Sequence, residues 1–194
     1  MSQSGNIHFV GVGGQGILLA SEMTAYALLA AGFDIKKSEV HGMAQRGGSV
    51  EAHLRYASDK VYSPLIEPGT VDIQLAFETM EAARYLPYLN QRSKVIVNTQ
   101  RIMPPAVATG KMRYPENCLE ALTAKGIEVI PVDAYAIAKE LGNIKAANVV
   151  LVGALSSFLP LEGEIFQEVI QARLPAKIQA VNLEAFAAGR RLTR

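Results

Sequence analysis

Apolar residues in this chain fall in short runs that alternate with longer stretches, a pattern that predicts strands alternating with helices. The first run, residues 7–10, is short and ends at a glycine, as a buried strand does. Residues 17–31 contain only three polar side chains, so we expect a helix that is enclosed on most sides. Residues 34–40 read as a second strand. This β-α-β order predicts that the two strands pair in parallel within an α/β fold.

Residues 49–56 show the clearest two-residue alternation in the chain. One face carries Val50, Ala52, Leu54 and Tyr56, and the other carries Ser49, Glu51, His53 and Arg55. The pattern predicts a half-exposed strand whose polar face borders solvent or another subunit. The turn at Ser58-Asp59 into Val61-Tyr62 predicts an antiparallel ribbon over residues 49–63.

The rest of the chain continues the alternation and ends in helices. Further strands are predicted at 71–77, 95–97 and 127–132, and helices at 78–86, 115–126, 134–141, 164–174 and 176–189. Residues 148–159 fit a buried strand or a buried helix, and their length and the stop at Pro160 favour a helix. We therefore expect one Rossmann-like domain over residues 1–194, with a mostly parallel sheet flanked by helices, an antiparallel ribbon and a helical C-terminus.

Composition narrows the possible functions. The chain has 19 basic and 18 acidic residues, and the cations are dispersed, so no nucleic-acid partner is expected. The N-terminal residues carry no leader pattern, and no stretch of about 20 apolar residues offers a membrane span. We expect a cytoplasmic protein without a membrane partner.

The few metal-binding residue types do not indicate a metal site. Cys118 is the only cysteine, which excludes an internal disulfide and an iron–sulfur cluster held by this chain alone. The histidines His8, His41 and His53 lack a metal-ligand spacing. We therefore expect no metal here, and a structural rather than a nucleophilic role for Cys118.

A glycine-rich loop between the first strand and the first helix is the strongest candidate for binding. Its residues are Gly11, Val12, Gly13, Gly14, Gln15 and Gly16. Glycines let the backbone approach a ligand closely, and the amides at a helix N-terminus attract anions. The spacing also matches the dinucleotide fingerprint, although one match of this kind is a weak signal. Glu39 is a minor candidate for the acidic residue that would bind a ribose.

A second candidate loop follows the second predicted strand. It reads His41, Gly42, Met43, Ala44, Gln45, Arg46, Gly47 and Gly48. If the two strands are parallel, both loops lie at the carboxyl edge of the sheet, where α/β proteins bind ligands. Arg46 has a planar, permanently charged group that suits phosphate or carboxylate, but it would equally tie the loop to Glu39. His41 is open to a local or a functional role, and Met43 to packing or to covering an aromatic substrate.

The two loops carry a family resemblance. Residues 11–16 and 38–50 resemble the gamma-type subunit or domain of the 2-oxoacid:ferredoxin oxidoreductases, and the second loop is most similar to the indolepyruvate branch. The resemblance extends over about residues 7–188. It implies a subunit of a complex that oxidatively decarboxylates an aryl 2-oxoacid with coenzyme A and ferredoxin.

The resemblance also implies a division of labour. Thiamine diphosphate and iron–sulfur clusters carry out such chemistry, and this chain lacks both the cysteines and the Gly-Asp-Gly motif that would hold them. A large partner subunit must supply both cofactors. The glycine-loop amides and Arg46 are then expected to hold coenzyme A phosphates, to hold the substrate carboxylate, or to contact the partner.

Two other functions stay open from the sequence. A free-standing NAD(P)-binding oxidoreductase would use the glycine loop, but no substrate domain or catalytic pair follows it. A non-enzymatic assembly subunit would use both loops purely as an interface. Hydrolase and nucleotide kinase functions lack their motifs, since Ser156-Ser157 has no Gly-x-Ser-x-Gly turn and no lysine follows the glycines.

Overall fold

The computed structural model describes residues 3–41 and 47–193, and of His41 only the backbone. Its centre is a six-stranded sheet in the order β2-β3-β1-β4-β5-β6. The strands are β1 (Ser4–Val12), β2 (Asp34–His41), β3 (Ser49–Ala57), β4 (Ile73–Ala76), β5 (Lys94–Asn98) and β6 (Glu128–Val132). β1, β4, β5 and β6 pair in parallel, and β3 is antiparallel to both of its neighbours. The mostly parallel α/β fold predicted from the sequence is confirmed.

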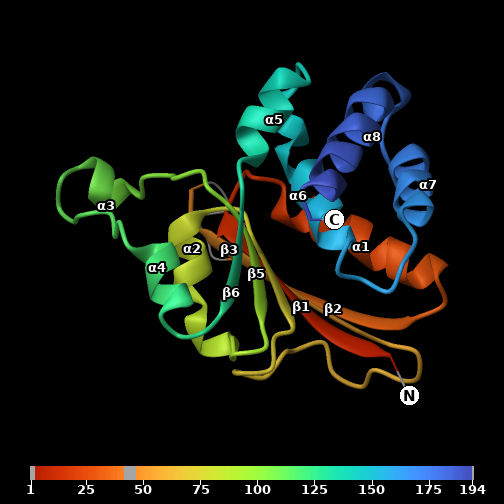
Figure 1. Ribbon diagram of the computed structural model, residues 1–194, viewed down its shortest axis with the longest axis horizontal. Coiled ribbons are helices and arrows are strands. Elements are labelled where there is room, and N and C mark those ends of the chain that lie inside the picture. Colours follow the sequence, from red (N-terminus) through yellow and green to blue (C-terminus); the bar gives the residue numbers. More distant parts are fainter. Residues whose placement is uncertain (1–2, 42–46, 194) are drawn as a thin grey trace.

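Helices cover both faces of the sheet (Figure 1). They are α1 (Ile17–Ala30), α2 (Thr79–Arg84), η1 (Leu86–Tyr88), α3 (Pro105–Ala108), α4 (Cys118–Thr123), α5 (Ala134–Glu140), η2 (Ile144–Ala146), α6 (Ala147–Ser156), α7 (Gly163–Arg173) and α8 (Ala176–Arg191). The larger core joins α1 and α5–α8 to one face, and a smaller core joins α2, η1 and α4 to the other. In the described part of the chain, no helix is both long and apolar enough to cross a membrane.

The predicted pairing of the first two strands is wrong. β1 and β2 run in the same direction, but β3 lies between them and pairs with each in antiparallel register. Helix α1 therefore connects strands that are not neighbours, and β2 and β3 form a hairpin. A β-α-β pattern indicates the relative direction of its strands, but it does not exclude a third strand inserted between them.

The antiparallel element near residues 49–63 is β3, and its partners differ from those predicted. Residues 61–62 form no strand, and the Val61 amide instead donates a hydrogen bond to the Asp34 carboxylate.

The predicted exposure of the polar face of β3 is also wrong. Glu51 is only partly exposed and His53 is buried, because α2 and η1 cover this side of the sheet. The alternation identified the two faces, but it did not show that both are covered.

Helix α6 is the centre of the larger core, and its closest contact is with α8. A Cβ atom at Gly153 would lie 2.1 Å from the Phe186 carbonyl oxygen, and one at Gly189 would lie 1.8 Å from the Val150 carbonyl oxygen. The two helix backbones therefore touch where both glycines lack a side chain. This close crossing explains why residues 148–156 are buried on every side and form a helix, as their length predicted.

We predict that Gly153→Ala lowers the free energy of unfolding by roughly 1–3 kcal/mol, because its methyl group meets backbone that cannot move without shifting α8. Gly163→Ala is the matched control, since a Cβ there would meet only the flexible Arg190 side chain, at 3.2 Å. Urea unfolding of both variants measures the difference. Equal stabilities of the two variants would contradict this account of the crossing.

Candidate functional site

The glycine-rich loop connects the end of β1 to the start of α1. Gly16 caps the helix with a φ of 82°, a left-handed conformation that favours glycine. It also has no space for a side chain, because a Cβ there would lie 2.6 Å from the Asn148 amide nitrogen. The Gly16 carbonyl accepts the first helical hydrogen bond from Ala20. The loop thus directs the first amides of a 14-residue helix toward the carboxyl edge of the sheet.

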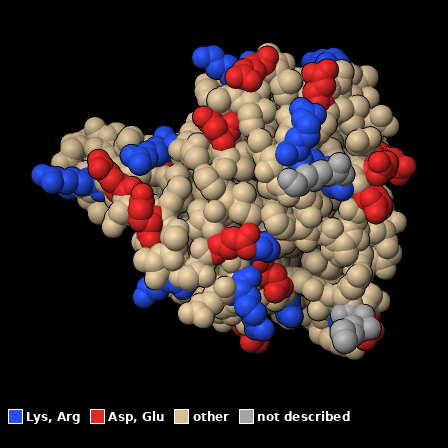
Figure 2. All heavy atoms as spheres, in the orientation of Figure 1, with Lys and Arg blue, Asp and Glu red and all other residues tan. Residues whose placement is uncertain are grey.

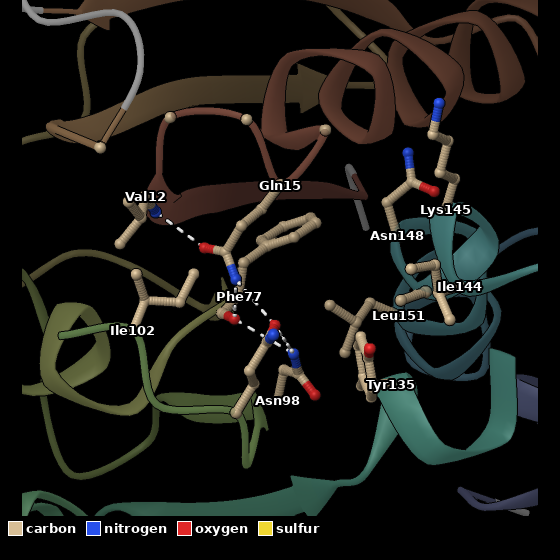
Figure 3. A pocket seen from close by; sticks show the side chains of 16 residues that line it. Val12, Gln15, Phe77, Asn98, Ile102, Tyr135, Ile144, Lys145, Asn148 and Leu151 are labelled. Carbon is tan, nitrogen blue, oxygen red and sulfur yellow. Dashed lines mark hydrogen bonds between the residues drawn. The ribbon is translucent and has the colours of Figure 1, made fainter. Parts of the chain in front are cut away.

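Gln15 stabilises this loop with its side chain. Its Oε1 accepts a hydrogen bond of 2.8 Å from the Val12 amide, and its Nε2 donates one of 2.7 Å to the Phe77 carbonyl. The side chain therefore bridges the ends of β1 and β4. Gln15, which the sequence placed among the binding residues, has its polar atoms engaged in positioning the loop (Figure 3).

The two candidate loops meet where the structure describes both of them. The Gly13 amide donates a 2.8 Å hydrogen bond to the Gly48 carbonyl, and the Gly47 amide donates one of 3.2 Å to the Gly13 carbonyl. The contact arises from the antiparallel pairing of β1 with β3, not from the parallel pairing that we expected. The β2 backbone ends at His41, opposite Val50 of β3. The remaining predicted residues Gly42, Met43, Gln45 and Arg46 lie outside the described residues.

A cleft of about 680 Å³ opens beside the glycine loop. Its floor includes Phe77 and Asn98, and its far wall comes from α5, η2 and α6, with Tyr135 and Asn148 facing the loop (Figure 3). The described residues that line it are Val12, Gly13, Gly14, Gln15, Gly16, Gly47, Phe77, Asn98, Gln100, Ile102, Tyr135, Ile144, Lys145, Ala147, Asn148 and Leu151. Of the predicted site residues, the glycine loop and Gly47 line this cleft. Gly11 does not, since it packs against Phe77.

Two polar side chains on the far wall were missed from the sequence. Lys145 is the one cation among the described lining residues. Asn148 is only 6% exposed, and its side-chain amide lies beside Gly16. Both come from a segment more than a hundred residues after the loop, without any motif of its own. Only the fold brings them to the cleft beside the glycine loop.

The groups that line the cleft suit the binding of a ligand. Its described lining contains no carboxylate, histidine or cysteine that would act as a base or nucleophile. It does offer the partial positive charge of a helix N-terminus, the Lys145 ammonium and several side-chain amides. These groups favour an anionic or polar ligand whose reacting partner comes from elsewhere.

The topology argues against a nucleotide site of the NAD type. In that fold an acidic residue on the neighbouring strand binds the ribose. Here Glu39 is on β2, which β3 separates from β1, and its carboxylate forms an ion pair of 2.6 Å with Lys37. Glu39 is therefore not at the position that would bind a ribose beside the glycine loop.

The remaining polar candidates have structural roles. Cys118 is buried and its Sγ lies 3.2 Å from the Pro115 carbonyl oxygen. Burial raises the pKa of the Cys118 thiol, so it stays protonated near neutral pH. Ser156 is buried and donates to the Gly153 carbonyl. Neither side chain lines the cleft.

A second cluster lies on the face of the sheet under α2 and η1. His8 and His53 are opposite each other in the β1–β3 register, and both ring Nε2 atoms approach Oε2 of Glu51, at 2.9 and 3.5 Å. The three donor atoms lie within 4.8 Å of one another, which would suit a metal ion. Sequence spacing did not show this convergence, because the histidines are on different strands.

The hydrogen bonds favour a triad without a metal. The Ile66 amide donates to Nδ1 of His53, so that ring carries its proton on Nε2 and donates it to Glu51. Metal ligation through His53 Nε2 would require loss of this proton and of the Ile66 hydrogen bond, whereas metal-binding histidines ordinarily donate from the other nitrogen. In His8, Nδ1 is buried without a partner in the described structure, which disfavours a proton there. Both rings are thus neutral donors to one carboxylate.

We predict that acid destabilises the protein through this triad. Burial, the main cause, lowers the pKa of His8 below its ordinary 6.5, so the unfolded chain binds more protons and stability falls as pH drops through 6.5. Burial raises the pKa of Glu51, but hydrogen bonds from His53 and His8 outweigh it and hold the pKa at about 2. The contribution of ionised Glu51 to the free energy of unfolding is fully present above pH 4.5 and is lost as the pH falls toward 2.

Urea unfolding between pH 8 and pH 4 measures this dependence. His8→Gln should flatten the loss of stability between pH 7 and 5, whereas Glu168→Gln, an exposed control on α7, should leave it unchanged. An identical pH dependence in the wild type and His8→Gln would show that the triad does not control it.

Known proteins resemble this chain over nearly its whole length. Residues 6–192 match the family described as pyruvate ferredoxin/flavodoxin oxidoreductase. The indolepyruvate oxidoreductase subunit IorB of Archaeoglobus fulgidus is 43% identical over 188 residues, which cover 95% of this chain and 92% of that protein. The IorB subunit of Thermococcus kodakarensis is 41% identical, covering 95% of this chain and 93% of that protein.

Solved structures show the same fold. The gamma subunit of a keto/oxoacid ferredoxin oxidoreductase from Geobacter sulfurreducens PCA superposes with a TM-score of 0.72 at 21% identity, covering 97% of each chain. The 2-oxoglutarate:ferredoxin oxidoreductase from Magnetococcus marinus gives a TM-score of 0.78 at 22% identity, covering 98% of this chain but 31% of that one. Together with the match over residues 6–192, these likenesses show that this chain belongs to the pyruvate ferredoxin/flavodoxin oxidoreductase family.

Proposed function

We propose that this chain is the small subunit of an indolepyruvate:ferredoxin oxidoreductase. The complex would convert an aryl 2-oxoacid, coenzyme A and two oxidised ferredoxins into an acyl-coenzyme A, carbon dioxide, two reduced ferredoxins and a proton. The carbon–carbon bond to the carboxylate breaks, a thioester bond forms, and ferredoxin accepts the two electrons. The reaction belongs to the complex and not to this chain alone.

One observation carries the proposal. Four IorB subunits are 37–43% identical to this chain and cover 95% of it, whereas the 2-oxoglutarate and ketoisovalerate relatives are 26–27% identical. The cleft supports a subunit role, because its described residues offer binding groups but no carboxylate, histidine or cysteine. Another 2-oxoacid as the preferred substrate is the alternative within the same family.

The redox and decarboxylation cofactors are assigned to the large subunit. A single cysteine cannot hold an iron–sulfur cluster, and the chain has no Gly-Asp-Gly motif for thiamine diphosphate. When bound to the partner, these groups supply the carbanion chemistry and the electron path. Ferredoxin as the acceptor and a cytoplasmic location are part of the same proposal.

Within the complex, this chain would hold anionic parts of the reactants. The glycine loop, Lys145 and Asn148 all line the cleft, and their N–H donors and positive charge suit the phosphates of coenzyme A or the carboxylate of the 2-oxoacid. Arg46 and His41 are proposed to join this end of the site from the second loop. Gln15 would act as a positioning residue, since its side chain bridges β1 and β4.

Reconstitution tests the proposed function. We expect the chain to co-purify with a large subunit bearing thiamine-diphosphate and cysteine motifs. The pair should reduce ferredoxin only when indolepyruvate and coenzyme A are both present, with a higher kcat/KM than for pyruvate or 2-oxoglutarate. Full turnover by the large subunit alone would refute the requirement for this chain, and tight NADH binding by the isolated chain would revive the nucleotide alternative.

We predict that Lys145→Ala in the reconstituted complex raises KM for coenzyme A or for the 2-oxoacid about tenfold with little change in kcat, because it removes a charged contact formed on binding. Lys139→Ala, an exposed lysine of α5 outside the cleft lining, is the matched control. Arg46→Ala should act in the same direction. If both KM values stay at the wild-type level in the Lys145 and Arg46 variants, the anion-holding role is wrong.

A further inference from the structure

We propose that residues 99–117, which we call the arm, dock into an apolar groove with acidic borders on the large subunit. The arm leaves the sheet after β5, contains α3 and returns to the body at α4. Figure 1 shows it projecting away from the other elements on the side of α4. The inference rests on the proposed function, because that function supplies the partner.

The arm contributes nothing to the hydrophobic core of the chain. None of its residues is buried, and none belongs to either core cluster. Its apolar side chains remain in solvent, with Met103 50% and Met112 65% exposed. A four-residue helix has no stability of its own, and exposed apolar groups on a projecting segment are typical of a contact surface. Methionine is especially suited to an adaptable apolar interface.

The arm is nevertheless held firmly at its base. Glu78 is fully buried at the start of α2, and its carboxylate accepts hydrogen bonds from the Tyr114 hydroxyl and the Ile102 amide. The Tyr114 hydroxyl also contacts the Thr79 hydroxyl at 2.6 Å. Both ends of the arm are thus tied to one buried carboxylate. A segment fixed in this way is presented to a partner with little loss of freedom on binding.

The charge of the arm indicates the character of the groove. Its cations are Arg101, Lys111 and Arg113, and its single carboxylate is Glu116. In Figure 2 a Lys or Arg side chain lies at the far end of the projecting part, with Asp or Glu side chains nearer the body. Arg101 is further positioned over the Tyr114 ring, 5.6 Å from its centre. Methionine between cations fits an apolar groove bordered by carboxylates.

The position of the arm indicates which partner covers it. Gln100 and Ile102, the first residues of the arm, also line the cleft beside the glycine loop. The described lining of that cleft has no carboxylate, histidine or cysteine, and in the proposed function the reacting cofactors belong to the large subunit and approach from the open side. A subunit that brings them there stands directly against the arm. The large subunit is therefore the occupant that the geometry favours.

The test uses the full chain co-expressed with a tagged large subunit. Met103→Asp/Met112→Asp should weaken the complex about tenfold or more, because both side chains would carry charge into an apolar groove. Leu65→Asp is the matched control. Leu65 is 54% exposed and lies in the segment between β3 and β4, which leaves the sheet at the end opposite to the carboxyl ends of the parallel strands. The dissociation constant is measured by sedimentation, and thermal unfolding of each free variant verifies that the chain still folds.

A second variant tests the charge. Lys111→Glu/Arg113→Glu should also weaken the complex, and raising the salt concentration should weaken the wild-type complex more than this variant. Wild-type affinity in both arm variants, or an equal loss in Leu65→Asp, would overturn the docking of the arm. The proposed function itself fails if the wild-type chain neither binds the large subunit nor is required for turnover, so the two failures are distinguishable.

Discussion

The bridge formed by the Gln15 side chain is the interaction on which the rest of the site depends. It joins the last amide of β1 to the carbonyl that follows β4 and thereby closes the carboxyl edge of the sheet between them. With the loop held there, Gly13 meets Gly48, and Gly16 starts α1 against Asn148. The Asn98 amide extends the same bridge by donating to the Phe77 carbonyl and accepting from the first amide of α5. A row of side-chain amides thus fixes the floor of the cleft.

Much of the fold was predictable, because periodic patterns report burial locally. The enclosed helices α1 and α6 follow from short-range rules. The order of the strands did not follow. We predicted that both loops lie at one edge because we expected β1 and β2 to be neighbours. The described parts of the two loops do meet, but the contact arises because β3 pairs with β1. An antiparallel strand begins where its neighbour ends, so the hairpin loop reaches the same edge by a different route.

The candidate site was less predictable, because half of it comes from segments without a motif. Lys145 and Asn148 reach the glycine loop only through the packing of α5, η2 and α6 against the sheet. The pairing of His8 with His53 likewise depends on strand register, and the polar face of β3 is buried because α2 and η1 cover it. The local sequence pattern shows which side chains share a face of a strand or helix, whereas the packing of the whole chain determines whether that face contacts solvent or another element.

Hydrogen–deuterium exchange of the chain, free and in complex with the large subunit, tests the central claim most directly: the carboxyl edge of the sheet faces the partner and its reactants. The account predicts slower exchange on complex formation in the amides of residues 13–19, 47–49 and 100–116, with further slowing at 13–19 when coenzyme A or the 2-oxoacid is added. Protection confined to the opposite edge, around residues 58–70, with no change at the glycine loop, would contradict it.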